Sequence, residues 1–217
     1  MQNLIIILSA VILLAGLLFF EKKGARCGVL PTKTALSLLF IITAWFQPHP
    51  VGSYATLVLM GLICCLAGDV FLALPQERMF LAGLVSFLAG HVFYVAAFGL
   101  MSDLNRITFI GGAATLIAGM GVYAWLRPHL GTMKRPVICY ILVISCMVCS
   151  AGSILGTARL PAAGKIMVFM GAACFYLSDI LVARDRFLTN QFMNRLIGLP
   201  LYYSGQFLIA FSVGTLA

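Results

Sequence analysis

Long apolar runs separated by short polar stretches make up the chain from end to end. Because a transmembrane helix needs about 20 apolar residues, the runs predict eight membrane helices with short connections. They cover residues 3–20, 33–46, 54–74, 79–101, 107–126, 136–156, 164–183 and 196–216. Within each run the apolar residues are continuous and do not alternate with polar ones. An all-α polytopic protein is therefore predicted, and a β-barrel is not.

The prolines support these boundaries, because proline breaks the interior of a helix. Seven of them fall at or between the ends of the runs: Pro31, Pro48, Pro50, Pro75, Pro128, Pro136 and Pro161. Pro200 alone falls inside a run, within its first turns, where proline is tolerated. The first run is followed by Lys22, Lys23 and Arg26, the reverse of a secretory signal peptide, so it is predicted to be a retained helix.

The composition also indicates that the protein is embedded in a membrane. Of the 217 residues, 62% are hydrophobic and 9% are charged, whereas soluble domains average about 25% charged residues. So few charges do not cover a water-facing surface, and one transmembrane domain over residues 1–217 is predicted. The net charge of +8 does not indicate a nucleic-acid partner, because the basic residues lie in the loops.

The same basic residues predict an orientation. Eleven of them fall in the first, third, fifth and seventh connections, and three fall in the others. Cytoplasmic loops of membrane proteins carry the excess of Lys and Arg. The eleven-residue side is therefore predicted to be cytoplasmic, with both termini outside, and the short loops favour a bacterial inner membrane.

A shift of 110 residues aligns part of the chain with itself. It matches 58–73 with 168–183, superposing Asp69 on Asp179, and six of the sixteen positions are identical. This favours a 4 + 4 parallel repeat of residues 1–106 and 107–217, an arrangement found in some transporters.

Asp69 and Asp179 are the two acidic residues with apolar neighbours on both sides. The other four acids, Glu21, Glu77, Asp103 and Asp185, lie in loops or at helix ends and are interpreted as solvated. A carboxylate inside the bilayer costs about 2.5–3.5 kcal/mol, so such residues usually face a protein interior or a wet cavity. Both acids are predicted about 6–8 Å below the cytoplasmic boundary, at 1.5 Å per residue. The alternative is that each reaches the interface or pairs with Arg78 or Arg184.

Four further polar residues lie within apolar runs. His91 and Tyr94 are spaced i, i+3 and share one helix face, and Tyr203 and Gln206 have the same spacing in the last run. Interhelical hydrogen bonding accounts for such residues in many membrane proteins. A three-histidine metal site is not supported, because His49 and His129 fall in loops on opposite sides.

Together these motifs resemble the YhhN-like lysoplasmalogenase family over nearly the whole chain. The matching motifs are Gly68-Asp69-x-x-Leu72, Phe87-x-x-Gly90-His91-x-x-Tyr94, Gly171-x-x-x-Phe175-x-x-Ser178-Asp179 and Leu201-Tyr202-Tyr203-x-x-Gln206. One departure is Lys33-Thr34, where the family often has Lys-Pro.

The resemblance implies a hydrolase that cleaves the vinyl ether bond of a lysoplasmalogen, releasing a fatty aldehyde and glycerophospho-ethanolamine or -choline. It implies Asp69 and Asp179 as catalytic residues and no required metal or other cofactor. The partner is then a lysophospholipid within the membrane. Which aspartate is the acid stays open.

Substrate-binding roles are predicted for six residues: Lys33, Arg78, His91, Tyr94, Tyr203 and Gln206. The first two lie on the predicted cytoplasmic side, where a basic residue attracts a lipid phosphate. An alternative function is a small proton-coupled transporter or lipid flippase that uses the aspartate pair. The shallow position of both acids counts against it, because transporter sites lie near the midplane.

Overall fold

The computed structural model describes residues 2–216 and contains eight α-helices, with no strand among them. The helices are α1 (Gln2–Lys23), α2 (Arg26–Phe46), α3 (Gly52–Ala73), α4 (Glu77–Met101), α5 (Arg106–Leu126), α6 (Lys134–Leu155), α7 (Ala162–Phe187) and α8 (Phe192–Ser212). Two short 3₁₀ turns, η1 (Arg127–His129) and η2 (Gly131–Met133), connect α5 to α6. The all-α prediction is confirmed.

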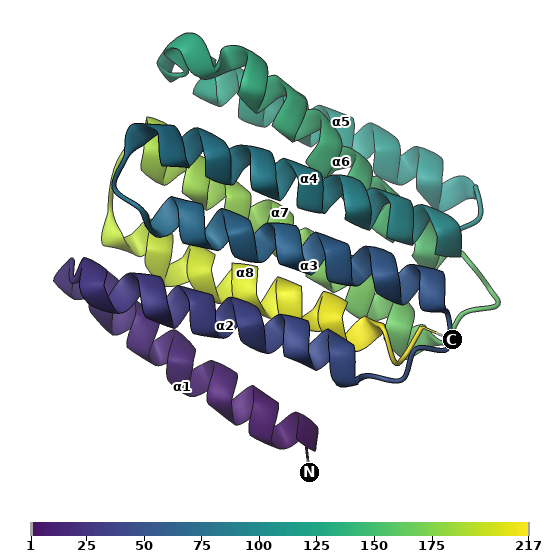
Figure 1. Cartoon of the computed structure of the whole chain (residues 1–217). Helices are drawn as coiled ribbons and strands as arrows, with labels where there is room; N and C mark the ends of the chain where they lie inside the picture. Colours follow the sequence, from purple (N-terminus) through teal and green to yellow (C-terminus); the bar gives the residue numbers. More distant parts are fainter. Residues whose placement is uncertain (1, 217) are drawn as a thin grey trace.

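The eight helices alternate in direction and form one bundle. The start of α1 and the last turn of α8 therefore lie at the same end of the bundle (Figure 1). α1 and α2 form one side, α5 and α6 form the other, and α3, α4, α7 and α8 lie between them (Figure 1). The sidedness of the membrane and the internal repeat stay predictions.

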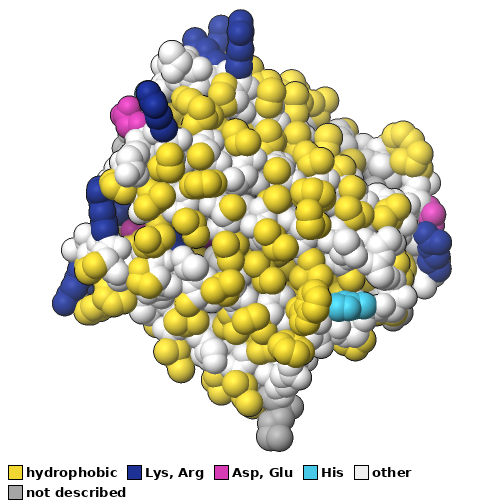
Figure 2. Space-filling view, in the orientation of Figure 1, with side chains coloured by type: hydrophobic (Ala, Val, Ile, Leu, Met, Phe, Trp, Pro, Cys, Tyr) yellow, Lys and Arg dark blue, Asp and Glu magenta, His cyan; other side chains and the backbone are white. Residues whose placement is uncertain are grey.

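Seven helices, α1 to α7, are long and apolar enough to cross a membrane. α8 is not among them, because it carries Asn194, Tyr202, Tyr203 and Gln206, all buried. It packs against α1, α2, α3 and α7, so its polar groups meet protein instead of lipid, as polar groups at membrane depth do. The space-filling view shows apolar side chains over the middle of the bundle and most Lys and Arg at its margins (Figure 2). The protein is an integral membrane protein.

Four helix boundaries differ from the prediction by four residues or more. α2 begins at Arg26 and holds Pro31 inside it, so the expected start near residue 33 is wrong. Pro31 lies in the second turn, where its missing N–H costs the helix one backbone hydrogen bond without ending it. α7 continues one turn past residue 183 to Phe187, because Arg184, Asp185 and Arg186 are helical rather than part of the loop. α8 runs from Phe192 to Ser212 instead of 196–216, so both of its ends lie four residues earlier and Pro200 lies inside the helix, beyond its first two turns.

Small residues let neighbouring helices approach closely. A Cβ at Gly205 of α8 would lie 2.8 Å from the carbonyl oxygen of Gly171 in α7, and one at Gly90 of α4 would lie 3.1 Å from that of Gly61 in α3. Membrane helices pack tightly where small residues allow such contact. The α3–α4 and α7–α8 pairs thereby fix the positions of the two aspartates, which lie on α3 and α7.

Candidate active site

A cavity of about 790 Å³ lies at the end of the bundle where α1 joins α2, α3 joins α4 and α7 joins α8. This is the end that carries the most basic connections. Its lining includes both Asp69 and Asp179, so the structure brings together the two acids that the sequence placed at similar depth. Ligand sites typically have volumes of about 300–1,000 Å³. The cavity is large enough to be one.

Asp69 lies at the base of the cavity, 1% exposed, and is surrounded by donors. Ser37 and Tyr202 each donate a hydrogen bond to its Oδ2 at 2.6 Å, and Lys33 Nζ lies 3.4 Å from Oδ1. Lys33 and Ser37 are spaced i, i+4 and so share one face of α2. The ammonium of Lys33 can only donate, and both hydroxyls can donate, so this environment suits an ionised carboxylate, which only accepts hydrogen bonds.

Asp179 has a different environment. Tyr140 of α6 donates a hydrogen bond to its Oδ2 at 2.6 Å, and the Nε2 atom of His91 lies 3.8 Å from the same oxygen. No Lys or Arg side chain pairs with it among the described residues. Its side chain is 18% exposed, against 2% for that of Asp69, so Asp179 is the more accessible acid.

A hydrogen bond to a backbone carbonyl one turn earlier in α4 holds His91 in one orientation. Its Nδ1 lies 2.6 Å from the carbonyl oxygen of Phe87, and a carbonyl only accepts, so Nδ1 carries the hydrogen. In the neutral ring Nε2 is then an acceptor. Nε2 is buried without a hydrogen-bond partner in the described part of the chain, and it faces Asp179. An acceptor nitrogen that faces a carboxyl oxygen suits the protonated form of Asp179, which has a hydrogen to donate.

Five of the six predicted substrate-binding residues do not line the cavity. Tyr94 donates a hydrogen bond to Gln206 Oε1 at 2.8 Å in the buried core, and the Tyr203 hydroxyl is buried. Arg78 is exposed at the start of α4. Neither these four residues nor His91 lines the cavity, whereas Lys33 does, as the ion-pair partner of Asp69. Their roles in binding stay predictions, as does the absence of a metal requirement.

Three side chains that contact the aspartates carried no role in the sequence interpretation: Ser37, Tyr140 and Tyr202. Ser37 and Tyr140 come from the helix just before that of their acid, 32 and 39 residues away, and Tyr202 lies 133 residues from Asp69. Ser37 had a weak signal in its spacing from Lys33, and Tyr140 is a polar group inside the apolar run 136–156. Their partners depend on which helices are neighbours, and the sequence did not establish that.

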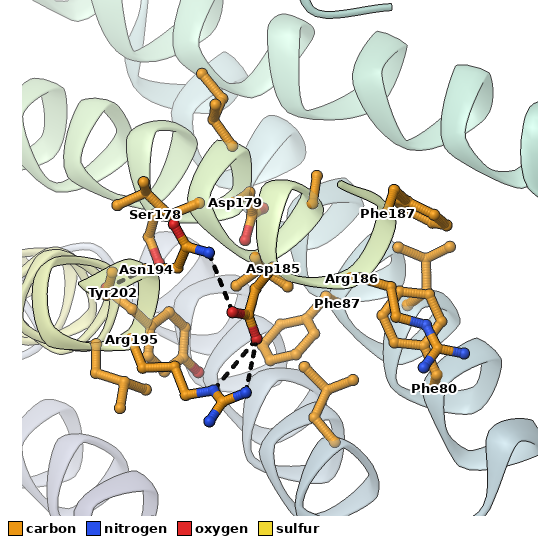
Figure 3. Close-up of a pocket in the computed structure, with 18 of the residues that line it drawn as sticks. Phe80, Phe87, Ser178, Asp179, Asp185, Arg186, Phe187, Asn194, Arg195 and Tyr202 are labelled. Carbon is orange, nitrogen blue, oxygen red and sulfur yellow. Dashed lines mark hydrogen bonds and ion pairs between the residues drawn. The ribbon is translucent and has the colours of Figure 1, made fainter. Parts of the chain in front are cut away.

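Charged side chains surround the mouth of the cavity. Arg195 lies 3.0 Å from Asp185, to which Asn194 also donates (Figure 3). Arg195 also lies 3.6 Å from Glu21. Arg186 lies over the ring of Phe80, with the guanidinium carbon 4.5 Å from the ring centroid (Figure 3). The interpretation of Glu21 and Asp185 as solvated loop charges is therefore wrong, because both are 17% exposed and paired with Arg195.

The family model of the YhhN family matches residues 29–213, which include both aspartates and all of the side chains that contact them. The chain belongs to the YhhN family. This confirms the resemblance drawn from the motifs.

Two curated relatives of this YhhN protein are named lysoplasmalogenase, one from Mycobacterium bovis and one from Mycobacterium tuberculosis. Each is 36% identical over 86 residues, which is 39% of this chain and 29% of the relative. The match therefore spans under a third of the length of these relatives. No solved structure matches the chain.

Proposed function

We propose that this protein hydrolyses the vinyl ether bond of lysoplasmalogens, releasing a fatty aldehyde and a glycerophospho-ethanolamine or -choline. The observation that carries the proposal is the pair of aspartates in one membrane cavity, each with a different set of partners. The YhhN family and the name of the two mycobacterial relatives support the substrate class.

Asp179 is the general acid in this proposal. Vinyl ether hydrolysis begins when an acid protonates the carbon β to the ether oxygen, which leaves an oxocarbenium ion. Asp179 faces the cavity, and its neighbours are the Tyr140 hydroxyl and the acceptor nitrogen of His91. No cation among the described residues pairs with it, so its surroundings suit the protonated form. His91 and Tyr140 act as positioning residues.

Asp69 is the base and the electrostatic stabiliser. Its three donors, Lys33, Ser37 and Tyr202, hold it as a fixed negative charge. A fixed carboxylate stabilises the positive charge of the oxocarbenium ion as it forms, and preorganised charge of this kind is a large contribution to catalysis. The same carboxylate then takes a proton from the attacking water. Glycosidases solve a related oxocarbenium problem with two carboxylates, which is an analogy of mechanism and not of fold.

The protons balance over the whole reaction. Asp179 gives its proton to the β carbon, and water adds to the carbon next to oxygen while Asp69 removes one of its protons. The resulting hemiacetal collapses, its hydroxyl proton returns to Asp179, and the proton held by Asp69 passes to the departing glycerol oxygen. Both aspartates regain their starting states, and one water is consumed for each aldehyde released.

A direct assay tests the proposal. Purified protein in detergent is given 1-alkenyl lysophosphoethanolamine, and the fatty aldehyde is measured by mass spectrometry. We expect aldehyde from the vinyl ether and none from the matched saturated 1-alkyl lipid, which has no double bond to protonate. If the vinyl ether lipid also gives no aldehyde, the hydrolase proposal is wrong, and the transporter or flippase alternative gains support.

We place the protein in a bacterial inner membrane with the cavity mouth on the cytoplasmic side. Support comes from the eleven basic residues that lie in or near the helix ends and connections at this end, because the cytoplasmic side of membrane proteins carries such an excess. The substrate then enters from the inner leaflet, with its head group near the charged mouth.

A further inference from the structure

The lining of the cavity changes character from one side of the bundle to the other. On the α1–α2 side it carries four charged residues of both signs: Glu21, Arg26, Lys33 and Arg195 of α8. We call these residues the head lobe. On the α5–α6 side it is apolar, with Val122, Leu126, Val137, Ile141 and Ile144, which we call the tail lobe. These two sides lie at opposite edges of the bundle (Figure 1).

The tail lobe lies between two separate hydrophobic clusters. Tyr140 and Ile144 belong to the main core. Leu126 and Val137 belong to a smaller cluster where α5, the 3₁₀ turns, α6 and the end of α7 meet, and Val122 and Ile141 pack against it. Protein interiors are normally close-packed. An apolar space lined by members of both clusters suits an apolar ligand.

We propose that the tail lobe binds the single hydrocarbon chain of the lipid substrate, with the polar head group in the head lobe. The head lobe carries charges of both signs, with Glu21 paired to Arg195, and so fits a zwitterionic phospho-amine, which carries one charge of each sign. It does not fit a second acyl chain, because burying charged groups against hydrocarbon is costly. The inference rests on the proposed function only in placing the ether linkage between the two aspartates.

This orientation agrees with the separate assignment of the acid. In the group O–CH=CH–R, the carbon that takes the proton lies one bond further along the chain than the carbon that takes water. Asp179 contacts Tyr140 of α6, on the tail-lobe side, and Asp69 contacts Lys33 of α2, on the head-lobe side. The proton donor therefore lies nearer the chain, and the base lies nearer the glycerol.

Photolabelling tests the proposal without turnover. The probe is a saturated 1-O-hexadecyl lysophosphoethanolamine with a diazirine in the middle of its chain. Labelled peptides are mapped by mass spectrometry, with and without an excess of the same lipid lacking the diazirine. We expect competed labels on residues 122–144 and at the end of α7. Competed labels on α1 or α2 would reverse the orientation, and labelling that is not competed would mean no chain site; either result overturns the proposal.

A matched pair of variants sharpens the test. Ile141→Trp fills the tail lobe, whereas Leu142→Trp adds the same side chain on the exposed, outer face of α6. We expect Ile141→Trp to reduce competed labelling at least tenfold and Leu142→Trp to leave it unchanged. Equal labelling in the two variants would overturn the proposal. Thermal unfolding checks that both fold, and Val122→Phe replaces Ile141→Trp if that variant does not.

The two proposals fail separately. The probe has no vinyl ether, so its labelling reports binding alone. A protein that binds the probe in the tail lobe but releases no aldehyde from the vinyl ether lipid would remove the hydrolase proposal and leave the chain site intact. Release of aldehyde without competed labels in the tail lobe would support the hydrolase proposal and remove the chain site.

Discussion

Asp179→Asn is expected to lower the rate of aldehyde release by about 10²–10⁴-fold, the range that general acid catalysis contributes. The amide keeps the shape of the side chain and can still accept a hydrogen bond from Tyr140, but it has no acidic proton for the β carbon. The stability of the fold should change little, because Asp179 has no cationic partner among the described residues. The measurement is kcat with the 1-alkenyl lipid beside thermal unfolding.

Asp103→Asn is the matched control for that substitution. Asp103 is 64% exposed and pairs with Arg159 at the other end of the bundle, and exposed pairs contribute little to stability. Its variant should keep full activity. Wild-type activity in Asp179→Asn would remove Asp179 from the mechanism, and an equal loss in both variants would indicate a general effect of the purification.

Asp69→Asn is expected to reduce both activity and stability. The loss of the carboxylate removes the base and the charge that stabilises the oxocarbenium ion, so we again expect about 10²–10⁴-fold slower turnover. It also leaves the ammonium of Lys33, 7% exposed, without its partner. Breaking a buried ion pair costs about 3–5 kcal/mol, which should appear as a lower unfolding temperature.

The double variant Lys33→Met, Asp69→Asn separates the two effects. It removes the unpaired charge, and replacing a buried ion pair by uncharged groups is often neutral for stability. The unfolding temperature should recover, while aldehyde release should not. Recovery of activity in the double variant would mean that Asp69 acts only by pairing with Lys33, and its role as the base would be wrong.

The helices and the two acids were predictable because they depend on local signals. Apolar runs long enough to cross a membrane give a helix whatever its neighbours are, and a lone carboxylate such as Asp69 stands out among apolar residues. Helix ends were less predictable. Pro31 suggested a start after it, but a proline near the start of a helix removes little backbone bonding, and α2 begins at Arg26.

The partners of the acids were not predictable from one sequence. Lys33 was expected to attract a phosphate, and its pairing with Asp69 was not foreseen. Tyr140 and Asp179 are 39 residues apart, and Tyr202 and Asp69 are 133 residues apart. Such contacts follow from which helices pack side by side, which in a membrane depends on close packing and interhelical hydrogen bonds. The pattern of apolar residues along one sequence does not indicate which helices pack closely or which hydrogen bonds form between them.

Isotope incorporation tests the central claim, that an aspartate protonates carbon to open the vinyl ether. The wild-type protein hydrolyses 1-alkenyl lysophosphoethanolamine in D₂O, and the aldehyde is reduced at once to the alcohol and analysed by mass spectrometry. Because the proton of Asp179 exchanges with solvent, we predict one deuterium on the carbon next to the former carbonyl. Authentic aldehyde added to the same buffer and reduced after the same time should carry none. An enzymatic product without deuterium at that carbon would contradict protonation by either aspartate.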